Sequence, residues 1–291
     1  MIRKSTWADY VIHFILMLLA AVSILPFYNV LITSFADPAA VAKQQFYLWP
    51  TSFDWSSYEI LFKGSYIATS VKNSLLVTIL GVGVNMAVTT CGAYALSKKG
   101  MPGRNLIMAG VVFTMLFSGG LIPLYLTIKN LNLINHYGSM IFPVAVSTFF
   151  LIVMINQFRD IPESLEESAR LDGANDLHIL FRIVIPITKP TIAAISLFYA
   201  VARWNEWYYA MLFLTDTDKY PMQLFLRNML MDVTKMASSD SGASMIGQLS
   251  EAYPDGLKMA SVVVTMLPIM IVYPFLQKHF AAGVTLGAVK E

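Results

Sequence analysis

Long apolar segments alternate with shorter polar segments along the whole of this 291-residue sequence. A membrane-spanning helix needs about 20 predominantly apolar residues, because hydrocarbon offers no water to satisfy its backbone polar groups. The segments that meet this requirement are residues 10–35, 70–96, 105–128, 139–158, 191–214 and 259–280. The pattern therefore predicts an all-α membrane protein, a single transmembrane domain of six spanning helices over residues 1–291.

The third of these segments contains a run of helix-breaking residues. Ser118, Gly119 and Gly120 precede Pro123, so a break or kink is expected before the segment ends. Membrane helices tolerate such a break where the freed backbone groups face protein or a water-filled cavity. The break is therefore either a bend that serves packing or part of a gate along a pathway.

Lysine and arginine near the ends of spans are retained on the cytoplasmic side of a membrane. With the N-terminus inside, the inner segments carry more of these residues than the outer segments, although the outer segments are longer in total. An even number of spans puts both termini on one side. The sequence thus predicts a multi-pass chain with both termini and the loop of residues 159–190 in the cytoplasm.

Two outer segments differ in composition. In residues 37–69, the aromatic residues have spacings that suit a short interfacial helix: Trp49, Trp55, Tyr58 and Phe62. Residues 215–258 are richer in Ser, Gly and Asp and are predicted to form an external loop. A loop of this length either contacts an external partner or is a passive connection.

The polar stretch 163–190 begins with a signal for the start of a helix. Asp160 offers a capping side chain, Pro162 suits the first turn, and Glu163 places an acid there. A helix from about Pro162 to Leu171 is predicted.

The surface of this helix carries acidic and small residues. Glu166 and Glu167 precede Arg170 by four and three residues, the spacing at which ion pairs form along a helix. Ser168 and Ala169 are small, so another backbone can approach them closely.

A second helix is predicted after a glycine turn. Gly173 can adopt a positive φ, and Asn175 or Asp176 can cap the second helix at its start. An apolar stripe at helical spacing, ending before Pro186, consists of Leu177, Leu180, Phe181 and Val184. Two short helices of this kind suit a docking element for a soluble partner; the alternative is an amphipathic loop that seals the cytoplasmic face.

The composition excludes several classes of protein. Apolar residues make up 56% of the chain and charged residues 13%, which does not describe a soluble surface. A net charge of +2 gives no support for nucleic acid binding. Cys91 is the one cysteine, so there is no disulfide framework and no metal-ligand spacing, and it is expected to be a small buried residue.

The spacing Glu-x-Ala-x3-Gly-x9-Ile-x-hydrophobic-Pro resembles the signature loop of permease subunits of bacterial ABC importers. The matching residues are Glu167, Ala169, Gly173, Ile183, Ile185 and Pro186. Ser168 stands where the family usually has alanine, and Ile185 where leucine is commoner. The run Arg203–Trp207 and the ending 283–291 are similar to the carbohydrate-importer branch. Residues 117–125 and 138–143 are similar to the second permease of systems that import oligosaccharides from complex polysaccharides.

The resemblance implies a type I ABC importer permease architecture in the bacterial cytoplasmic membrane. It implies a coupling helix seated in an ATPase subunit, with coupling residues Glu167, Ser168, Ala169, Gly173, Ile183 and Pro186. The implied partners are a second homologous permease chain, two ATPase subunits, an extracytoplasmic solute-binding protein, an oligosaccharide substrate and membrane lipid, with no nucleic acid. The sequence has no Gly-x4-Gly-Lys-Ser/Thr loop, so ATP and Mg²⁺ are expected in the partner subunits, and no cofactor on this chain.

The fifth predicted span contains ionisable residues. Arg203 and Glu206 lie about one turn apart, and such residues cost about 2.5–3.5 kcal/mol each to insert, which makes them functional candidates. The candidates for a saccharide path are Arg203, Trp204, Asn205, Glu206, Trp207 and Tyr208, with Asn85 and Tyr94 on the second span. The alternatives are a structural Arg203–Glu206 pair at the interface with the second permease, and hydrogen bonds between helices made by Asn85, Thr89, Thr90 and Tyr94.

Two other functional classes have less support in the sequence. An intramembrane enzyme needs a nucleophile and base or a metal site, but the sequence has no His-Glu-x-x-His or Gly-x-Ser-x-Gly pattern. The histidines are scattered, at His13, His136, His178 and His279. A passive channel predicts flux without ATP, and the docking loop argues against it.

Overall fold

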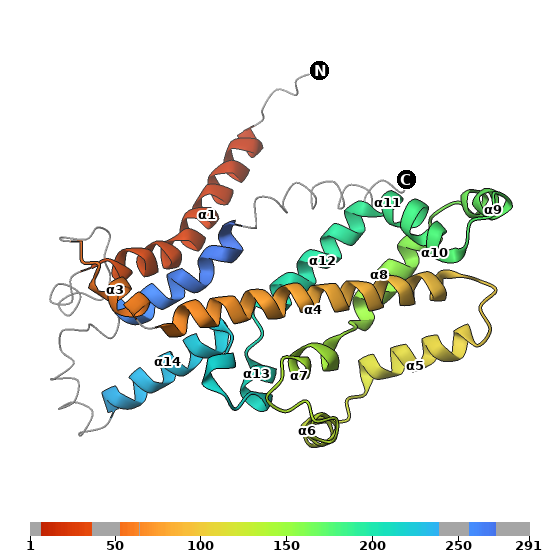
Figure 1. Ribbon diagram of the computed structural model, residues 1–291. Helices are drawn as coiled ribbons and strands as arrows, with labels where there is room; N and C mark the ends of the chain where they lie inside the picture. Colours follow the sequence, from red (N-terminus) through yellow and green to blue (C-terminus); the bar gives the residue numbers. More distant parts are fainter. Residues whose placement is uncertain (1–6, 37–52, 64, 239–255, 272–291) are drawn as a thin grey trace. The chain divides into compact units, whose positions relative to one another are not determined.

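The computed structural model describes residues 7–36, 53–63, 65–238 and 256–271 (Figure 1). These residues are helical almost throughout, and among them one isolated antiparallel bridge joins Ala36 to Phe53. The chain divides into two compact units, residues 1–68 with 226–268 and residues 69–225 with 269–291.

The first unit contains α1 (Trp7–Ser34), α3 (Ser56–Lys63) and residues 256–268 of the helix Gly256–Ile271. The ring of Phe35 stacks on Tyr58 and meets Trp55 edge-on, with ring centroids 4.8 Å apart in both pairs. The hydroxyls of Ser34 and Tyr58 are hydrogen-bonded at 2.7 Å. The short helix predicted between residues 37 and 69 is thus confirmed as α3, and Trp49 lies outside the described residues.

The second unit is a series of helices, most of them short. In chain order they are α4 (Ser65–Ser97), α5 (Arg104–Leu116), α6 (Leu121–Asn130), α7 (Gly138–Ile141), the 3₁₀ turn η1 (Phe142–Val144), α8 (Thr148–Arg159), α9 (Glu163–Leu171), α10 (Asp176–Ile179), the π turn η2 (Leu180–Val184), α11 (Ile185–Ile187), α12 (Lys189–Trp204), α13 (Tyr208–Phe213), the 3₁₀ turn η3 (Thr217–Lys219) and α14 (Met222–Ser238). Helix α4 begins and α14 ends in the first unit.

Two described helices, α1 and α4, are long and apolar enough to cross a membrane alone, and the number rises to five if each bent pair is one span. They correspond to the predicted spans 10–35 and 70–96. The predicted span 105–128 falls on α5 and α6, which meet at 117°. The break predicted from Ser118 to Pro123 is therefore present, between Leu116 and Leu121.

The remaining predicted spans show interruptions that the sequence pattern did not indicate. The predicted span 139–158 falls on α7 and η1 followed by α8, bent by 54°. The predicted span 191–214 is divided into α12 and α13 by residues 205–207. The predicted span 259–280 is described only as far as Ile271. Residues 222–238 of the predicted external loop form helix α14.

Two clusters of buried side chains hold the second unit together. The larger one joins α4, α8, η2 and α12, and it includes Ala93, Ile155, Val184 and Tyr199. The smaller one joins α4, α7, α13 and α14 through Val77, Met140, Ala210, Leu214 and Leu224. Cys91, expected to be buried, is exposed on α4, because it lies outside both of these clusters.

Candidate coupling site and polar interior

Helix α9 forms where the sequence pattern predicts it. Pro162 precedes its first residue, Glu163 lies in its first turn, and Arg170 lies in its last turn, which suits the helix dipole. Gly173, with a φ of 83°, ends the helical stretch as expected. The capping role predicted for Asp160 is wrong, because its backbone is still helical and its N–H donates to Asn156, so it ends α8.

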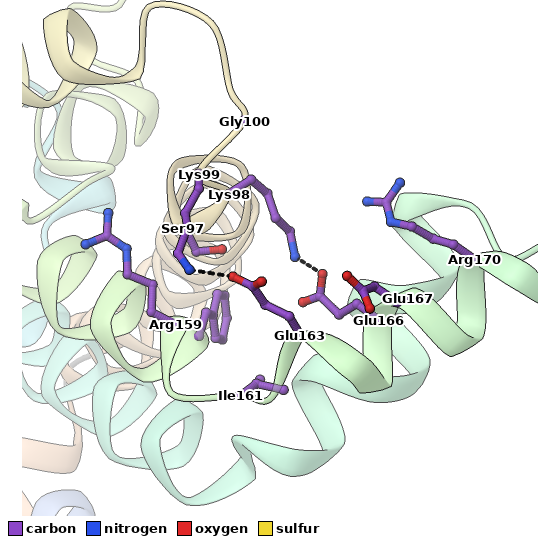
Figure 2. Close-up of a pocket in the computed structure, with 11 residues that line it drawn as sticks. Ser97, Lys98, Lys99, Gly100, Arg159, Ile161, Glu163, Glu166, Glu167 and Arg170 are labelled. Atoms are coloured by element: carbon purple, nitrogen blue, oxygen red, sulfur yellow. Dashed lines mark hydrogen bonds and ion pairs between the residues drawn. The ribbon is translucent and has the colours of Figure 1, made fainter.

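Two lysines that directly follow α4 form ion pairs with α9 (Figure 2). Lys98 pairs with Glu166, and the Lys99 Nζ lies 2.7 Å from Glu163 Oε1. The first pair is largely shielded, with exposed side-chain fractions of 29% and 16%, whereas the second is open at 84% and 70%. Lys98 also lies 4.0 Å from the centroid of the Tyr94 ring, one turn earlier on α4.

The open pair shifts the titration of both its members. The Lys99 ammonium donates a hydrogen bond to the Glu163 carboxylate and holds its pKa below the ordinary value. The carboxylate in turn raises the pKa of Lys99. Solvent screens a pair this exposed, so it adds little to stability.

The ion pairs predicted within α9 are wrong. Glu166 pairs with Lys98 instead of Arg170, and Arg170 pairs with Asp176 at the start of α10. The helical spacing allows the local pairs, but partners from other helices compete for the same charges. Glu167 is exposed on α9.

A charged cavity of about 340 Å³ lies between α9 and the ends of α4 and α8. Among the residues that line it are Ser97, Lys98, Arg159, Glu163, Glu166 and Arg170. Arg104 Nε donates to the Leu96 carbonyl at 2.8 Å, and Arg159 donates to the same carbonyl at 3.4 Å. The two arginines thus provide hydrogen-bond donors for a carbonyl in the last turn of α4, where helix carbonyls have no partner within the helix.

In the segment after Gly173, the structure confirms the predicted cap of the second helix but not the predicted apolar face. Asn175 caps α10 by accepting a hydrogen bond from the His178 N–H at 2.8 Å, as predicted. The predicted apolar stripe is divided, since Leu180 and Val184 are buried whereas Leu177 and Phe181 are 63% and 59% exposed.

A π turn lies within this segment, at Leu180–Val184. Its bonds run from residue i to i+5, so it rotates the side chains after it away from α-helical spacing. The buried side chains of the segment are Ile179, Leu180 and Val184. Pro186 lies inside the next helical turn, Ile185–Ile187, rather than beyond the helix end.

The residues predicted to couple to an ATPase lie together on α9 and the segment after it. Glu167, Ser168, Gly173 and Pro186 are exposed, and Ala169 and Ile183 are half-buried. The last two also line a hollow of about 450 Å³, together with Asp172, Gly173, Ala174, Asn175 and His178. Sequence reasoning missed Leu171, whose exposed fraction is 90%. Its position at the end of a charged helix was the available signal.

The substrate-path candidates divide by burial. Asn85, Tyr94, Arg203 and Trp204 are buried within the chain, whereas Asn205, Trp207 and Tyr208 are exposed and Glu206 is half-buried. Arg203 donates to the Met140 carbonyl at 2.8 Å. The Glu206 carboxylate accepts a hydrogen bond from the Tyr209 N–H at 3.0 Å. The two charged residues thus have separate partners.

Polar side chains of α4 form hydrogen bonds at and near the break between η1 and α8. Asn85 donates to the carbonyls of Val144 and Ala145, at 2.7 and 3.1 Å. Thr89 is hydrogen-bonded to the Tyr199 hydroxyl at 2.9 Å, and that hydroxyl accepts from the Ser147 N–H at 3.0 Å. Backbone groups freed by the break are thereby satisfied inside the protein. The geometry therefore supports the alternative of hydrogen bonds between helices at Asn85 and Thr89, and it places Tyr94 beside Lys98 instead.

Bent apolar helices with polar side chains buried between them, and a charged two-helix loop, define a helical membrane protein of the permease type. The chain belongs to the family described as binding-protein-dependent transport system inner membrane component, which matches residues 2–286. It is therefore a membrane-embedded transport subunit of an ABC importer and not an enzyme.

Two relatives from Bacillus subtilis (strain 168) are similar over nearly the whole chain. The polygalacturonan/rhamnogalacturonan transport system permease protein YtcP is 43% identical over 287 residues, covering 99% of each chain. Protein LplC is 41% identical over 272 residues, covering 93% of this chain and 90% of the relative.

A solved structure has the same fold. It is a bacterial ABC transporter involved in the import of the acidic polysaccharide alginate, and one of its chains is 31% identical with a TM-score of 0.84. The match covers 95% of this chain and 99% of that chain. The type I permease fold expected from the signature loop is confirmed.

Proposed function

We propose that this chain is one of two membrane-spanning subunits of an ATP-driven importer that carries oligosaccharides from acidic polysaccharides across the bacterial cytoplasmic membrane. The family assignment and the high similarity to a permease named for polygalacturonan and rhamnogalacturonan support the oligosaccharide substrate. Galacturonate carries a carboxylate, and the solved relative belongs to an importer of another acidic polysaccharide. Both names support an acidic cargo.

The observation that carries the coupling role is the exposed face of α9. One side of this helix carries Glu166, which pairs with Lys98, while Glu167 and Leu171 are exposed. Leu177 and Phe181 are exposed as well. Large apolar side chains gathered on a charged loop are typical of a surface that another protein covers, and a helix that docks in a groove does so through such anchors. In this proposal the groove belongs to an ATPase subunit.

The proposed assembly contains a second homologous permease, two ATPase subunits and an extracytoplasmic solute-binding protein. ATP and Mg²⁺ bind to the ATPase subunits, and both termini of this chain lie in the cytoplasm. The cations Lys98, Lys99, Arg104 and Arg159 gather near the loop that carries α9. This concentration of positive charge supports a cytoplasmic position by the positive-inside rule.

One substitution on α9 and one in the turn that follows it test the coupling role. Glu167→Lys and Gly173→Pro are each expected to reduce the ATPase that co-purifies with the membrane complex by about tenfold, the factor for ~1.4 kcal/mol of binding. Asp160→Lys is the matched control, because Asp160 is also exposed but ends α8. Full retention of the ATPase by both Glu167→Lys and Gly173→Pro would refute the proposal.

A further inference from the structure

Helix α4 is the longest helix among the described residues, and it is hydrogen-bonded to other elements along its length. It has 33 residues without a break. Three pairs of consecutive apolar helices elsewhere in the chain are bent by 54° to 117° at the break between their two members. Figure 1 shows it as one continuous ribbon. An unbroken helix moves as a unit, because each peptide is bonded to the turns on both sides of it.

The inner end of α4 is attached to α9. Lys98 pairs with Glu166, is shielded from solvent, and lies over the Tyr94 ring (Figure 2). A pair that is both shielded and supported by an aromatic ring keeps its geometry better than an open one. The neighbouring Lys99–Glu163 pair has neither property, since both side chains are exposed.

The outer end of α4 is attached to the segment 216–222. Asn73, which is buried, donates to the carbonyls of Asp218 and Tyr220, at 2.8 and 3.2 Å. Ser74, also buried, accepts a hydrogen bond from the Met222 N–H at 2.7 Å. This segment contains η3 and leads into α14, and the proposed orientation places it outside the cell.

The two attachments are far enough apart along α4 to lie on opposite sides of a bilayer. From Ser74 to Lys98 is a rise of about 36 Å at 1.5 Å per residue, and the hydrocarbon core is about 30 Å thick. Between them, Asn85 and Thr89 bind α4 to the break before α8 and to α12. A displacement of α9 therefore has a continuous hydrogen-bonded route to the external segment.

We propose that α4 is the strut that carries movement of the coupling helix α9 to the external segment 216–222. Lys98 and Glu166 are the positioning residues at its inner end, and Asn73 is the positioning residue at its outer end. This inference rests on the proposed function, because an ATPase at α9 must supply the movement. It adds a route through a different helix from those that flank α9 in sequence.

The test uses the complete importer, with its partner subunits, in proteoliposomes. A single reporter cysteine replaces exposed Thr217, in a Cys91→Ser background. Its reaction rate with a membrane-impermeant maleimide is measured with and without ATP. The ratio of the two rates in the parent protein defines the nucleotide response.

Lys98→Ala is expected to reduce this response, and the transport achieved per ATP hydrolysed, by about tenfold, within the range of coupling free energies between sites. Asn73→Ala should reduce the response to the same extent. Lys99→Ala is the matched control and should change it less than about twofold, because an exposed pair contributes little. The exchange of charges in Lys98→Glu with Glu166→Lys should restore at least half of the response, which a variant that merely misfolds does not do.

Co-purification of the ATPase is measured on the same samples. A full nucleotide response in Lys98→Ala, with the ATPase bound, would overturn the strut. A loss of response in Lys99→Ala equal to that in Lys98→Ala would overturn it too. Failure of the proposed function is a different outcome: the parent complex then binds no ATPase and gives no response to nucleotide.

Discussion

The side chain of Arg203 on α12 lies directly against the backbone of Gly81 on α4. A Cβ at Gly81 would lie 2.7 Å from Arg203 Cδ and 3.1 Å from Arg203 Cγ. A glycine at this position lets the two helices approach and leaves room for the guanidinium to reach the Met140 carbonyl. Arg203 therefore connects α4, α7 and α12 within the chain.

Gly81→Ala should destabilise the protein by about 1–3 kcal/mol, because the new methyl group overpacks a buried contact. The measurement is thermal unfolding of the purified chain in detergent. Gly83→Ala is the matched control on the same helix, since nothing lies within 4 Å of a Cβ there. If both variants unfold at the parent temperature, the close packing of Arg203 is contradicted.

Asn85→Leu should also destabilise the protein. The change leaves the carbonyls of Val144 and Ala145 without their donor in a buried setting, and each unsatisfied group costs about 1–3 kcal/mol. Asn105→Leu, at an exposed position on α5, controls for the loss of an amide. Equal unfolding temperatures for the two variants would show that Asn85 does not support the break.

The parts of the site that sequence reasoning predicted correctly are set by local chemistry. Pro162 and the acidic first turn start α9, Gly173 adopts the positive φ that ends it, and Asn175 caps α10. Such features depend on a few neighbouring residues, so a single sequence reveals them.

The parts that the sequence did not reveal depend on contacts between helices. The pairing of Lys98 with Glu166 joins residues 68 positions apart. The π turn at 180–184 shifts the side chains after it out of α-helical register, and helical spacing assumes that no such turn is present. Arg203 drew attention as a charge in an apolar span, but its burial against Gly81 is a property of two helices together.

Gly173→Ala should impair the loop without unfolding the protein. Left-handed backbone at this position, with φ 83°, costs an L-residue roughly 1–2 kcal/mol. The strain should shift α10 relative to α9 and weaken ATPase co-purification several-fold, while the unfolding temperature of the membrane region stays the same. Gly100→Ala is the control, because Gly100 has no crowding and no positive φ. A Gly173→Ala variant that binds ATPase as tightly as Gly100→Ala would contradict this role.

The Lys99–Glu163 pair predicts a specific pH dependence. Lys99 lowers the pKa of Glu163 from its ordinary value of 4.5. The contribution of Glu163 to folding stability is therefore present above pH 4.5 and is lost as the pH falls through the lowered pKa of the folded protein. Glu163 raises the pKa of Lys99 from its ordinary value of 10.5. The contribution of Lys99 to folding stability is therefore present below pH 10.5 and is lost as the pH rises through the raised pKa of the folded protein. The stability difference between the parent and Lys99→Ala should therefore be small and constant between pH 5.5 and 9.5, within those limits. It should vanish under strong acid. Chemical unfolding at a series of pH values measures it, and a change within the neutral range would be inconsistent with this pairing.

We propose that this chain couples ATP hydrolysis in partner subunits to the import of acidic oligosaccharides. The most direct measurement is uptake of labelled oligogalacturonides into proteoliposomes that contain the complete importer and its solute-binding protein. Uptake should require ATP on the side of α9 and should be lost in Glu167→Lys while Asp160→Lys still transports. Uptake that is equal with and without ATP, or that persists unchanged in Glu167→Lys, would contradict the account.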